Sequence, residues 1–219
     1  MNDLIYNPNF RRMLLKVTIF IITAVFSFSL NAQDSQTILF FGDSITAGYG
    51  LTEEEAFPAI IQQKIDSLGL NYNVVNSGLS GETTAGGLRR IDWVLQQHVD
   101  LFVLELGGND GLRGIDPENS KQNLQGIINK VSETYPDAKI LLTGMEAPPN
   151  MGQTYTSQFR DIYRELSTAN NVEFMPFILE GVAGSPVLNQ PDGIHPTAKG
   201  HRVVADDLWE YLRPMLSEN

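Results

Sequence analysis

The sequence predicts a single α/β domain, built on a doubly wound, mostly parallel five-stranded sheet with helices on both faces. Short apolar runs alternate with stretches in which apolar residues recur every three or four positions, as in a repeated strand–helix unit. The runs are apolar throughout, which is typical of strands buried on both faces. Neither a Pro/Ser-rich linker nor a repeat of fixed period divides residues 33–219, a length that suits one domain.

The expected strands are short, and the third is the most apolar of them. Runs of this length bounded by polar residues are typical of strands in parallel sheets. In chain order, the strands are expected at residues 37–41, 72–76, 101–106, 139–143 and 172–174.

The segments between the strands have the spacing of amphipathic helices. In the first of them, Phe57, Ile61 and Ile65 would share one face, because residues four apart lie one turn apart on a helix. The same pattern indicates helices over residues 57–68, 88–95, 124–131, 159–166 and 198–212.

The order of the strands would decide where a ligand binds. In a doubly wound sheet, ligands bind at the carboxyl ends of the strands, where the winding direction reverses. If the order is 2-1-3-4-5, that point lies between the first and third strands. Ser44 follows the first strand and Asn109 follows the third, so we expect both side chains at one crevice.

The first 32 residues have the pattern of an export signal. Arg11, Arg12 and Lys16 precede an apolar stretch over residues 17–30, which is shorter than the ~20 residues that a spanning helix needs. Cleavage is expected after Ala32, and an uncleaved membrane anchor is the alternative. We therefore expect a periplasmic or secreted domain at residues 33–219, with no stable membrane span once the signal is removed.

Composition excludes several classes of function. The chain has no cysteine, which rules out disulfides, thiol nucleophiles and Cys-based metal sites. Beyond residue 32 there are 12 basic and 25 acidic side chains, a net charge of −13. Such a surface repels phosphate backbones and anionic membranes, so no nucleic-acid partner is expected.

Ser44, Asp192 and His195 are the residue types of a serine hydrolase. Ser44 follows an apolar run and Gly42, whose small size would allow a sharp bend that exposes the hydroxyl. A serine hydroxyl needs a base to remove its proton, and the base needs a carboxylate to fix its tautomer. A helix N-cap is the alternative role for Ser44. The elbow G-x-S-x-G of α/β-hydrolases is disfavoured, because Thr46 stands where that motif has glycine.

His195 is the best candidate for the base among three histidines. It lies in a loop, whereas His98 is expected at the surface or at a helix end and His201 within the last helix. Asp192, three residues before His195, can reach the same side of a turn. The Asp192–Gly193 pair is also typical of a turn.

Two glycine-rich loops could supply hydrogen-bond donors for an oxyanion. Residues 76–83 follow the second strand and contain Gly78 and Gly81, which spacing alone does not separate. Residues 107–110 follow the third strand and contain Asn109; a flexible loop and a β-turn are the alternatives. The chain has neither the G-K-[ST] of a phosphate loop nor the histidine cluster of a two-metal phosphatase.

The four blocks G-D-S-I-T, S-G-E-T, G-G-N-D and D-G-I-H-P, in this order, resemble the GDSL or SGNH hydrolase family. The thioesterase I, arylesterase and lysophospholipase branch is the most similar, above all in the run from Glu105 to Gly114. The resemblance implies Ser44 as nucleophile, His195 as base and Asp192 as its orienting acid. It implies an oxyanion hole of Ser44, Gly81 and Asn109, favouring Gly81 over Gly78, and it implies no metal or cofactor.

The expected activity is hydrolysis of small-molecule carboxylic esters, aryl or acyl, with acyl thioesters or lysophospholipids as further substrates. Residues 144–152 differ from thioesterase relatives, some of which have a basic residue near Glu146, so simple esters are the safer expectation. A carbohydrate O-acetyl esterase and a non-catalytic binding domain are the alternatives. Apolar side chains on two loops beside the crevice are expected to hold the acyl chain or to anchor the loops: Leu112, Ile115, Pro148 and Met151.

Overall fold

The computed structural model of the chain describes residues 35–216. The chain divides into two units, Met1–Ser35 and Gln36–Asn219, and the second contains every helix and strand of the described part. The expected export signal lies outside the described residues. Within them, no helix is both long enough and apolar enough to cross a membrane.

The sheet has five strands in the order β2-β1-β3-β4-β5, and every neighbouring pair is parallel. The predicted fold class and the strand order 2-1-3-4-5 are therefore confirmed. Because β1 and β3 are neighbours, Gly42 at the end of β1 pairs with Glu105 at the end of β3. The strands are β1 (Gln36–Gly42), β2 (Tyr72–Gly78), β3 (Leu101–Glu105), β4 (Lys139–Thr143) and β5 (Glu173–Met175).

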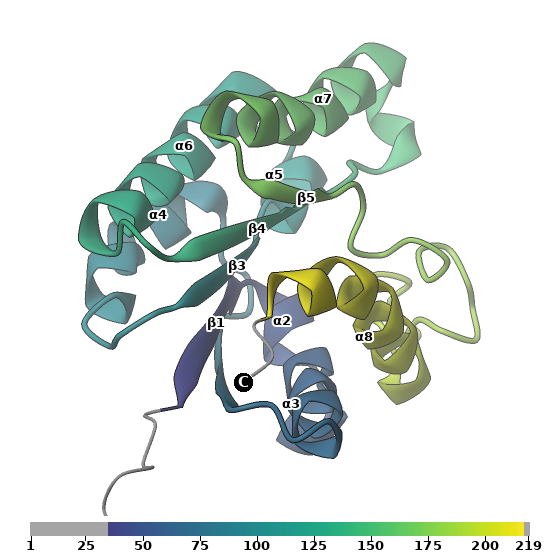
Figure 1. The fold of residues 1–219 in the computed structure, drawn as a ribbon. Coiled ribbons are helices and arrows are strands. Elements are labelled where there is room, and N and C mark those ends of the chain that lie inside the picture. The colour runs from purple at the N-terminus through teal and green to yellow at the C-terminus, as the bar shows by residue number, and fades with distance from the viewer. Residues whose placement is uncertain (1–34, 217–219) are drawn as a thin grey trace, which may run out of the picture. The chain divides into compact units, whose positions relative to one another are not determined.

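Helices cover both faces of the sheet (Figure 1). One face carries α3 (Phe57–Ser67) and α8 (Ala198–Leu212). The other face carries α4 (Thr84–Val94), α6 (Pro117–Thr134) and α7 (Gln153–Asn170). This is the arrangement that the sequence predicts, since connections between parallel strands cross over the sheet through helices.

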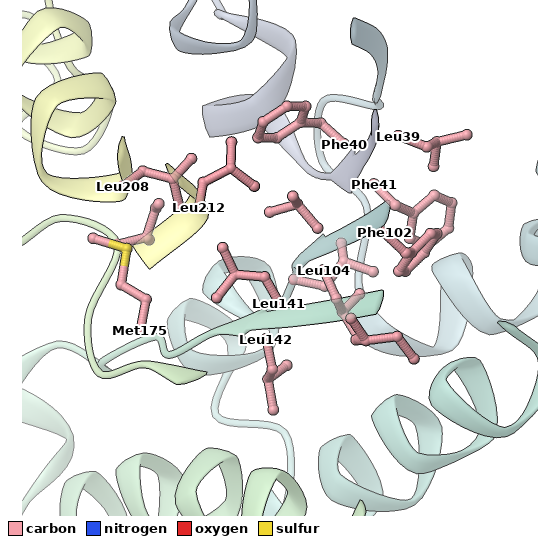
Figure 2. Close-up of a cluster of buried hydrophobic side chains, with 14 of the residues drawn as sticks. Leu39, Phe40, Phe41, Phe102, Leu104, Leu141, Leu142, Met175, Leu208 and Leu212 are labelled. Carbon is pink, nitrogen blue, oxygen red and sulfur yellow. The ribbon is translucent and has the colours of Figure 1, made fainter. Parts of the chain in front are cut away.

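The core lies on both sides of the central strands, because successive side chains of a strand point to opposite faces. The ring of Phe40 meets Phe57 of α3, with 5.5 Å between centroids, whereas Phe41 lies 5.6 Å from Phe102. Figure 2 shows the same alternation in β4, where Leu141 and Leu142 point away from each other. All of these side chains are buried.

Two short helices fall where the sequence suggests only turns. They are α2 (Ser44–Ala47), directly after β1, and α5 (Gly108–Arg113), directly after β3. Three of the predicted helices, α4, α6 and α7, begin earlier than expected, in segments with few apolar side chains. The helix α6 starts at Pro117, with the carboxylate of Asp116 accepting the N–H of Glu118 at 2.9 Å. Apolar periodicity cannot detect either feature, because a single turn has no repeat and a polar first turn has no apolar face.

Candidate active site

Ser44 is the first residue of α2, and Asp43 before it is the N-cap, its carboxylate accepting the N–H of Ile45 at 2.9 Å. The expectation of an exposed hydroxyl is wrong, since only 8% of Ser44 is exposed. Gly42 is needed for space rather than for a bend, because a Cβ there would lie 2.1 Å from Thr46 Oγ1 and 2.5 Å from Glu105 Oε2.

His195 connects Ser44 to Asp192. Its Nε2 lies 2.9 Å from Ser44 Oγ, and its Nδ1 lies 2.7 Å from Asp192 Oδ2. A carboxylate only accepts, so Nδ1 carries the proton and Nε2 is left to accept from the serine hydroxyl. The side chain and backbone N–H of His195, together with the N–H of Ile194, donate to Asp192 and lower its pKa to about 2.

The other two histidines lie away from Ser44. His98 is exposed and lies 3.1 Å from Asp100. His201 is buried on α8, and its Nδ1 accepts the backbone N–H of Phe57 at 3.1 Å, which caps the start of α3. Burial lowers the pKa of His201 to about 4. Both positions agree with the structural roles expected from the sequence.

Asn109 lies on α5 with its amide held from two sides. Its Nδ2 donates to Asp43 Oδ2 and to the carbonyl of Glu82, each at 3.1 Å. The Glu82 side chain forms an ion pair with Arg90, which also donates to the carbonyl of Ser77 at 3.0 Å. Asn109 therefore lies between Asp43, the N-cap of α2, and the segment after β2, as the strand order predicts.

Gly81 lies in that same segment, with a positive φ of 80°. A side chain there would be strained, because only glycine adopts such a conformation at little cost. Its carbonyl accepts from Arg113 at 3.2 Å. Gly78, the alternative glycine, has no room for a side chain, since a Cβ would lie 2.2 Å from the backbone nitrogen of Ala47.

Two buried carboxyl groups behind Ser44 were not anticipated from the sequence. Glu105 is fully buried, and its Oε2 accepts from the N–H of Asp43 at 3.2 Å and from Thr46 Oγ1 at 2.7 Å. Burial, and next the carboxylate of Asp43, raise the pKa of Glu105 well above its ordinary value. Burial also raises the pKa of Asp43 to about 6. The sequence does contain a signal for a buried carboxyl group, because Glu105 is an acidic residue at the end of the otherwise apolar strand β3.

A cavity of about 540 Å³ opens beside Ser44 and His195. Of the four predicted acyl-contacting residues, Leu112 and Pro148 line it, and Ile115 and Met151 do not. The carbonyl of Ile115 accepts from the Tyr155 hydroxyl at 2.7 Å, and the end of the Met151 side chain lies beside Gly114. Further apolar residues of the lining are Ile45, Met145, Ala147, Phe177, Leu179 and Ile194.

The cavity also has a charged rim. Glu146 lines it and forms an ion pair with Arg160, 2.8 Å between Oε1 and Nε. Among the residues that the structure describes, no three His, Cys, Asp or Glu side chains gather closely enough to hold a metal ion.

Comparison with known proteins agrees with this geometry. Residues 40–203 match the model of the GDSL-like lipase/acylhydrolase family. The chain belongs to that family. Esterase TesA of Pseudomonas aeruginosa is 39% identical over 183 residues, 83% of this chain and 90% of the relative. The Escherichia coli thioesterase 1/protease 1/lysophospholipase L1 is 36% identical over 192 residues, 87% of this chain and 90% of the relative.

Solved structures of family members have the same fold. A crystal structure of TesA superposes with a TM-score of 0.79 at 40% identity and covers 83% of this chain and 100% of that one. The psychrotrophic esterase EstA from Pseudoalteromonas, inhibited by monoethylphosphonate, gives 0.78 at 32% identity and covers 83% of this chain and 98% of that one. The predicted family is confirmed.

Proposed function

We propose that the chain is a serine esterase that hydrolyses carboxylic esters through an acyl-enzyme on Ser44. The observation that carries this proposal is the line of hydrogen bonds from Ser44 Oγ through His195 to Asp192. These are the contacts that a nucleophile, its base and the orienting acid require. Family membership supports it, because the relatives are named as esterase and thioesterase.

In the proposed reaction, His195 Nε2 takes the proton of Ser44 as Oγ attacks the ester carbonyl. The imidazolium then gives that proton to the leaving oxygen or sulfur, and the alcohol or thiol departs. Water, deprotonated by His195, attacks the acyl-enzyme, and Ser44 regains a proton as the acid leaves. Asp192 keeps the proton on Nδ1 throughout and stabilises the imidazolium.

We assign the oxyanion hole to the backbone N–H of Ser44, the N–H of Gly81 and the side-chain amide of Asn109. The first N–H groups of a helix have no partner within the helix, which leaves that of Ser44 available to the carbonyl oxygen. The amide of Asn109 donates to Asp43 and Glu82 in the free protein. These two acceptors orient the amide before the substrate arrives. The oxyanion of the substrate would then share the amide with one of them or replace it.

The cavity favours an acyl chain longer than acetyl. It has about 540 Å³ beside the nucleophile, and Leu112, Met145 and Pro148 give it apolar walls, whereas an acetyl group would fill little of that space. This argues for acyl or aryl esters over the O-acetyl esterase alternative. Glu146 on the rim is paired with Arg160, so its charge does not select between neutral esters, lysophospholipids and acyl thioesters. The domain would work in the periplasm or outside the cell if residues 1–32 act as an export signal.

An active-site probe and an ester panel test the proposal. A fluorophosphonate should label the wild-type chain on the peptide that contains Ser44 and should leave Ser44→Ala unlabelled. Ser44→Ala should also lose ester turnover by several orders of magnitude, with an unchanged far-UV spectrum and melting temperature. Ser157→Ala, an exposed serine on α7, serves as the matched control. Full turnover in folded Ser44→Ala would overturn the mechanism, and an unlabelled, inactive wild type would favour a non-catalytic binding domain.

A further inference from the structure

The loop that carries Asp192 and His195 is anchored in the core at its start by the buried Ile178 and Val182, whereas its end near His195 is held by hydrogen bonds. Residues 176–197 form turns without a helix or strand, apart from a single bridge between Asn189 and Pro196. Ser44 belongs to α2, far away in the sequence. The 2.9 Å distance between Ser44 Oγ and His195 Nε2 therefore requires something that ties this loop to the segment after α2.

Gln190 makes that connection. Its side-chain Nε2 donates to the carbonyl of Tyr49 at 2.7 Å and to the carbonyl of Pro196 at 3.0 Å. Its backbone N–H donates to the carbonyl of His195 at 2.7 Å. Tyr49 in turn donates its own N–H to the carbonyl of Ser44 at 3.0 Å. Through its backbone N–H and its side-chain amide, Gln190 thus links the backbone directly after the His195 ring to Tyr49, whose own N–H is bonded to the carbonyl of Ser44.

The ring of Tyr49 also touches the ring of His195. Their centroids are 4.4 Å apart, with 37° between the planes, which is well within the ~6 Å at which a cation is attracted to an aromatic face. Tyr49 is 51% exposed, so its ring is not held there by burial in the core. In the proposed reaction the imidazole becomes an imidazolium while it lies against this ring.

We propose that Tyr49 and Gln190 are positioning residues: Gln190 fixes the loop backbone around His195, and the Tyr49 ring orients the imidazole and stabilises its protonated form. The assignment rests on the proposed function for its catalytic consequence, but the contacts with His195 are those of the free protein. The other titratable groups that face His195 are Asp192 on its own loop, Asp43 before α2 and His201 on α8. None of them changes when Tyr49 is replaced.

The kinetic test separates the ring of Tyr49 from its hydroxyl. Tyr49→Leu should lower kcat for an acetyl ester by about 3- to 30-fold, as expected for a cation–aromatic contact, with little change in KM. Tyr49→Phe keeps the ring and should recover most of the loss. Gln190→Met, which removes both side-chain hydrogen bonds, should lower kcat in the same way. Tyr211→Leu, an exposed tyrosine on α8, is the control that should leave kcat unchanged.

Histidine NMR tests the same contact without turnover. The titration midpoint of the His195 ring, assigned with a His195→Asn variant, should move to lower pH by roughly half a unit in Tyr49→Leu. It should stay in place in Tyr49→Phe and Tyr211→Leu. An unmoved midpoint in folded Tyr49→Leu, or equal losses of kcat in Tyr49→Phe and Tyr49→Leu, would overturn the role of the ring. Unchanged kcat in Gln190→Met would overturn the role of the amide. A wild type without esterase activity would refute the proposed function alone, because the NMR midpoint still reports the contact.

Discussion

The proposed nucleophile, Ser44, and its proposed base, His195, lie in regions of opposite character. Ser44 and Asn109 lie on short helices that directly follow β1 and β3, two neighbouring strands in the middle of the sheet. Asp192 and His195 lie on a long run of turns between β5 and α8. Ser44 is 8% exposed, whereas the Asp192 side chain is 37% exposed. Near the site, the described structure joins the two regions through the contact between His195 Nε2 and Ser44 Oγ and through the hydrogen bond from Gln190 to the carbonyl of Tyr49.

This difference shows that the two pairs of site residues are positioned in different ways. The sheet places Ser44 and Asn109, so their positions follow from the packing of the whole domain. Asp192 and His195 take their positions from local hydrogen bonds, including two backbone N–H groups donated to Asp192 Oδ1 at 2.9 and 3.0 Å. We therefore expect substitutions in the loop to change catalysis with little effect on stability, and substitutions behind Ser44 to change both.

The largest effect is expected from Asp192→Asn. An asparagine can donate to Nδ1 and so favour the wrong imidazole tautomer, which lowers kcat by about 10³- to 10⁴-fold in serine hydrolases. Stability should fall only modestly, because the side chain is partly exposed and an asparagine oxygen can still accept from the N–H groups of Ile194 and His195. Steady-state kinetics and thermal melting check both statements, with Asp137→Asn, an exposed aspartate outside the site, as control.

The pH profile sharpens this prediction. The pKa of Asp192, held at about 2 by its hydrogen bonds with His195 and Ile194, keeps the carboxylate charged wherever the enzyme works. Its contribution to stability is present above the ordinary aspartate pKa and is lost as the pH falls toward 2. A fall in kcat/KM between about pH 7 and 6 would then reflect protonation of an imidazole or of Asp43, whose pKa burial raises to about 6, and not of Asp192. Near wild-type turnover in Asp192→Asn would show that the loop does not hold the orienting acid.

On the sheet side, Asn109→Ala should lower kcat by about 10²- to 10³-fold with little change in KM, as the loss of one oxyanion donor does. It should also destabilise the protein slightly, because Asp43 loses a hydrogen-bond donor. Asn129→Ala, an exposed asparagine on α6, is the matched control. An unchanged kcat would mean that the amide serves only to hold Asp43 and Glu82 together.

The cavity wall gives a smaller and more selective effect. Burial of each CH₂ of an acyl chain contributes about 0.8 kcal/mol, so kcat/KM should rise from acetyl to octanoyl esters. Leu112→Asp should reduce turnover of octanoyl esters about tenfold more than that of acetyl esters. Leu68→Asp, at an exposed leucine beyond α3, should reduce neither. Equal losses for both esters, or a wild type that prefers acetyl esters, would favour the O-acetyl esterase alternative.

The sequence predicts the strands and longer helices well because each has a buried face that repeats at a fixed period. It predicts that Ser44 and Asn109 share a crevice, since they follow strands that the winding makes neighbours. It does not reveal α2 and α5, which are too short to show a period. Nor does it reveal the contact between Gln190 and Tyr49, whose partners are distant in the chain and carry no motif. The cavity lining was predicted only in part. Ile115 and Met151 lie outside it, where Ile115 is bonded to Tyr155 and Met151 lies beside Gly114, and the sequence does not reveal these contacts.

The smallest effect concerns the buried acid behind Ser44. Burial and the nearby Asp43 carboxylate raise the pKa of Glu105 well above 4.5, so the folded chain holds a proton that the unfolded chain releases. The stability that Glu105 contributes is thus fully present below pH 4.5 and is lost as the pH rises toward the folded pKa. Glu105→Gln stays neutral at every pH. Its carbonyl can accept from Asp43 and Thr46 as Oε2 does, and its amino group would take the place of Oε1, which has no partner in the described structure.

The variant should therefore gain stability relative to the wild type as the pH rises from 5 to 8. Urea unfolding at pH 5, 6.5 and 8 measures this difference, with Glu133→Gln on the exposed side of α6 as control. The kcat of Glu105→Gln should change little if Glu105 affects only the stability of the region around β1, β3 and α2. A stability difference that does not depend on pH would show that Glu105 is ionised in the folded protein. Glu105 would then be a buried charge next to α2, stabilised by the hydrogen bonds that its Oε2 accepts from Asp43 and Thr46.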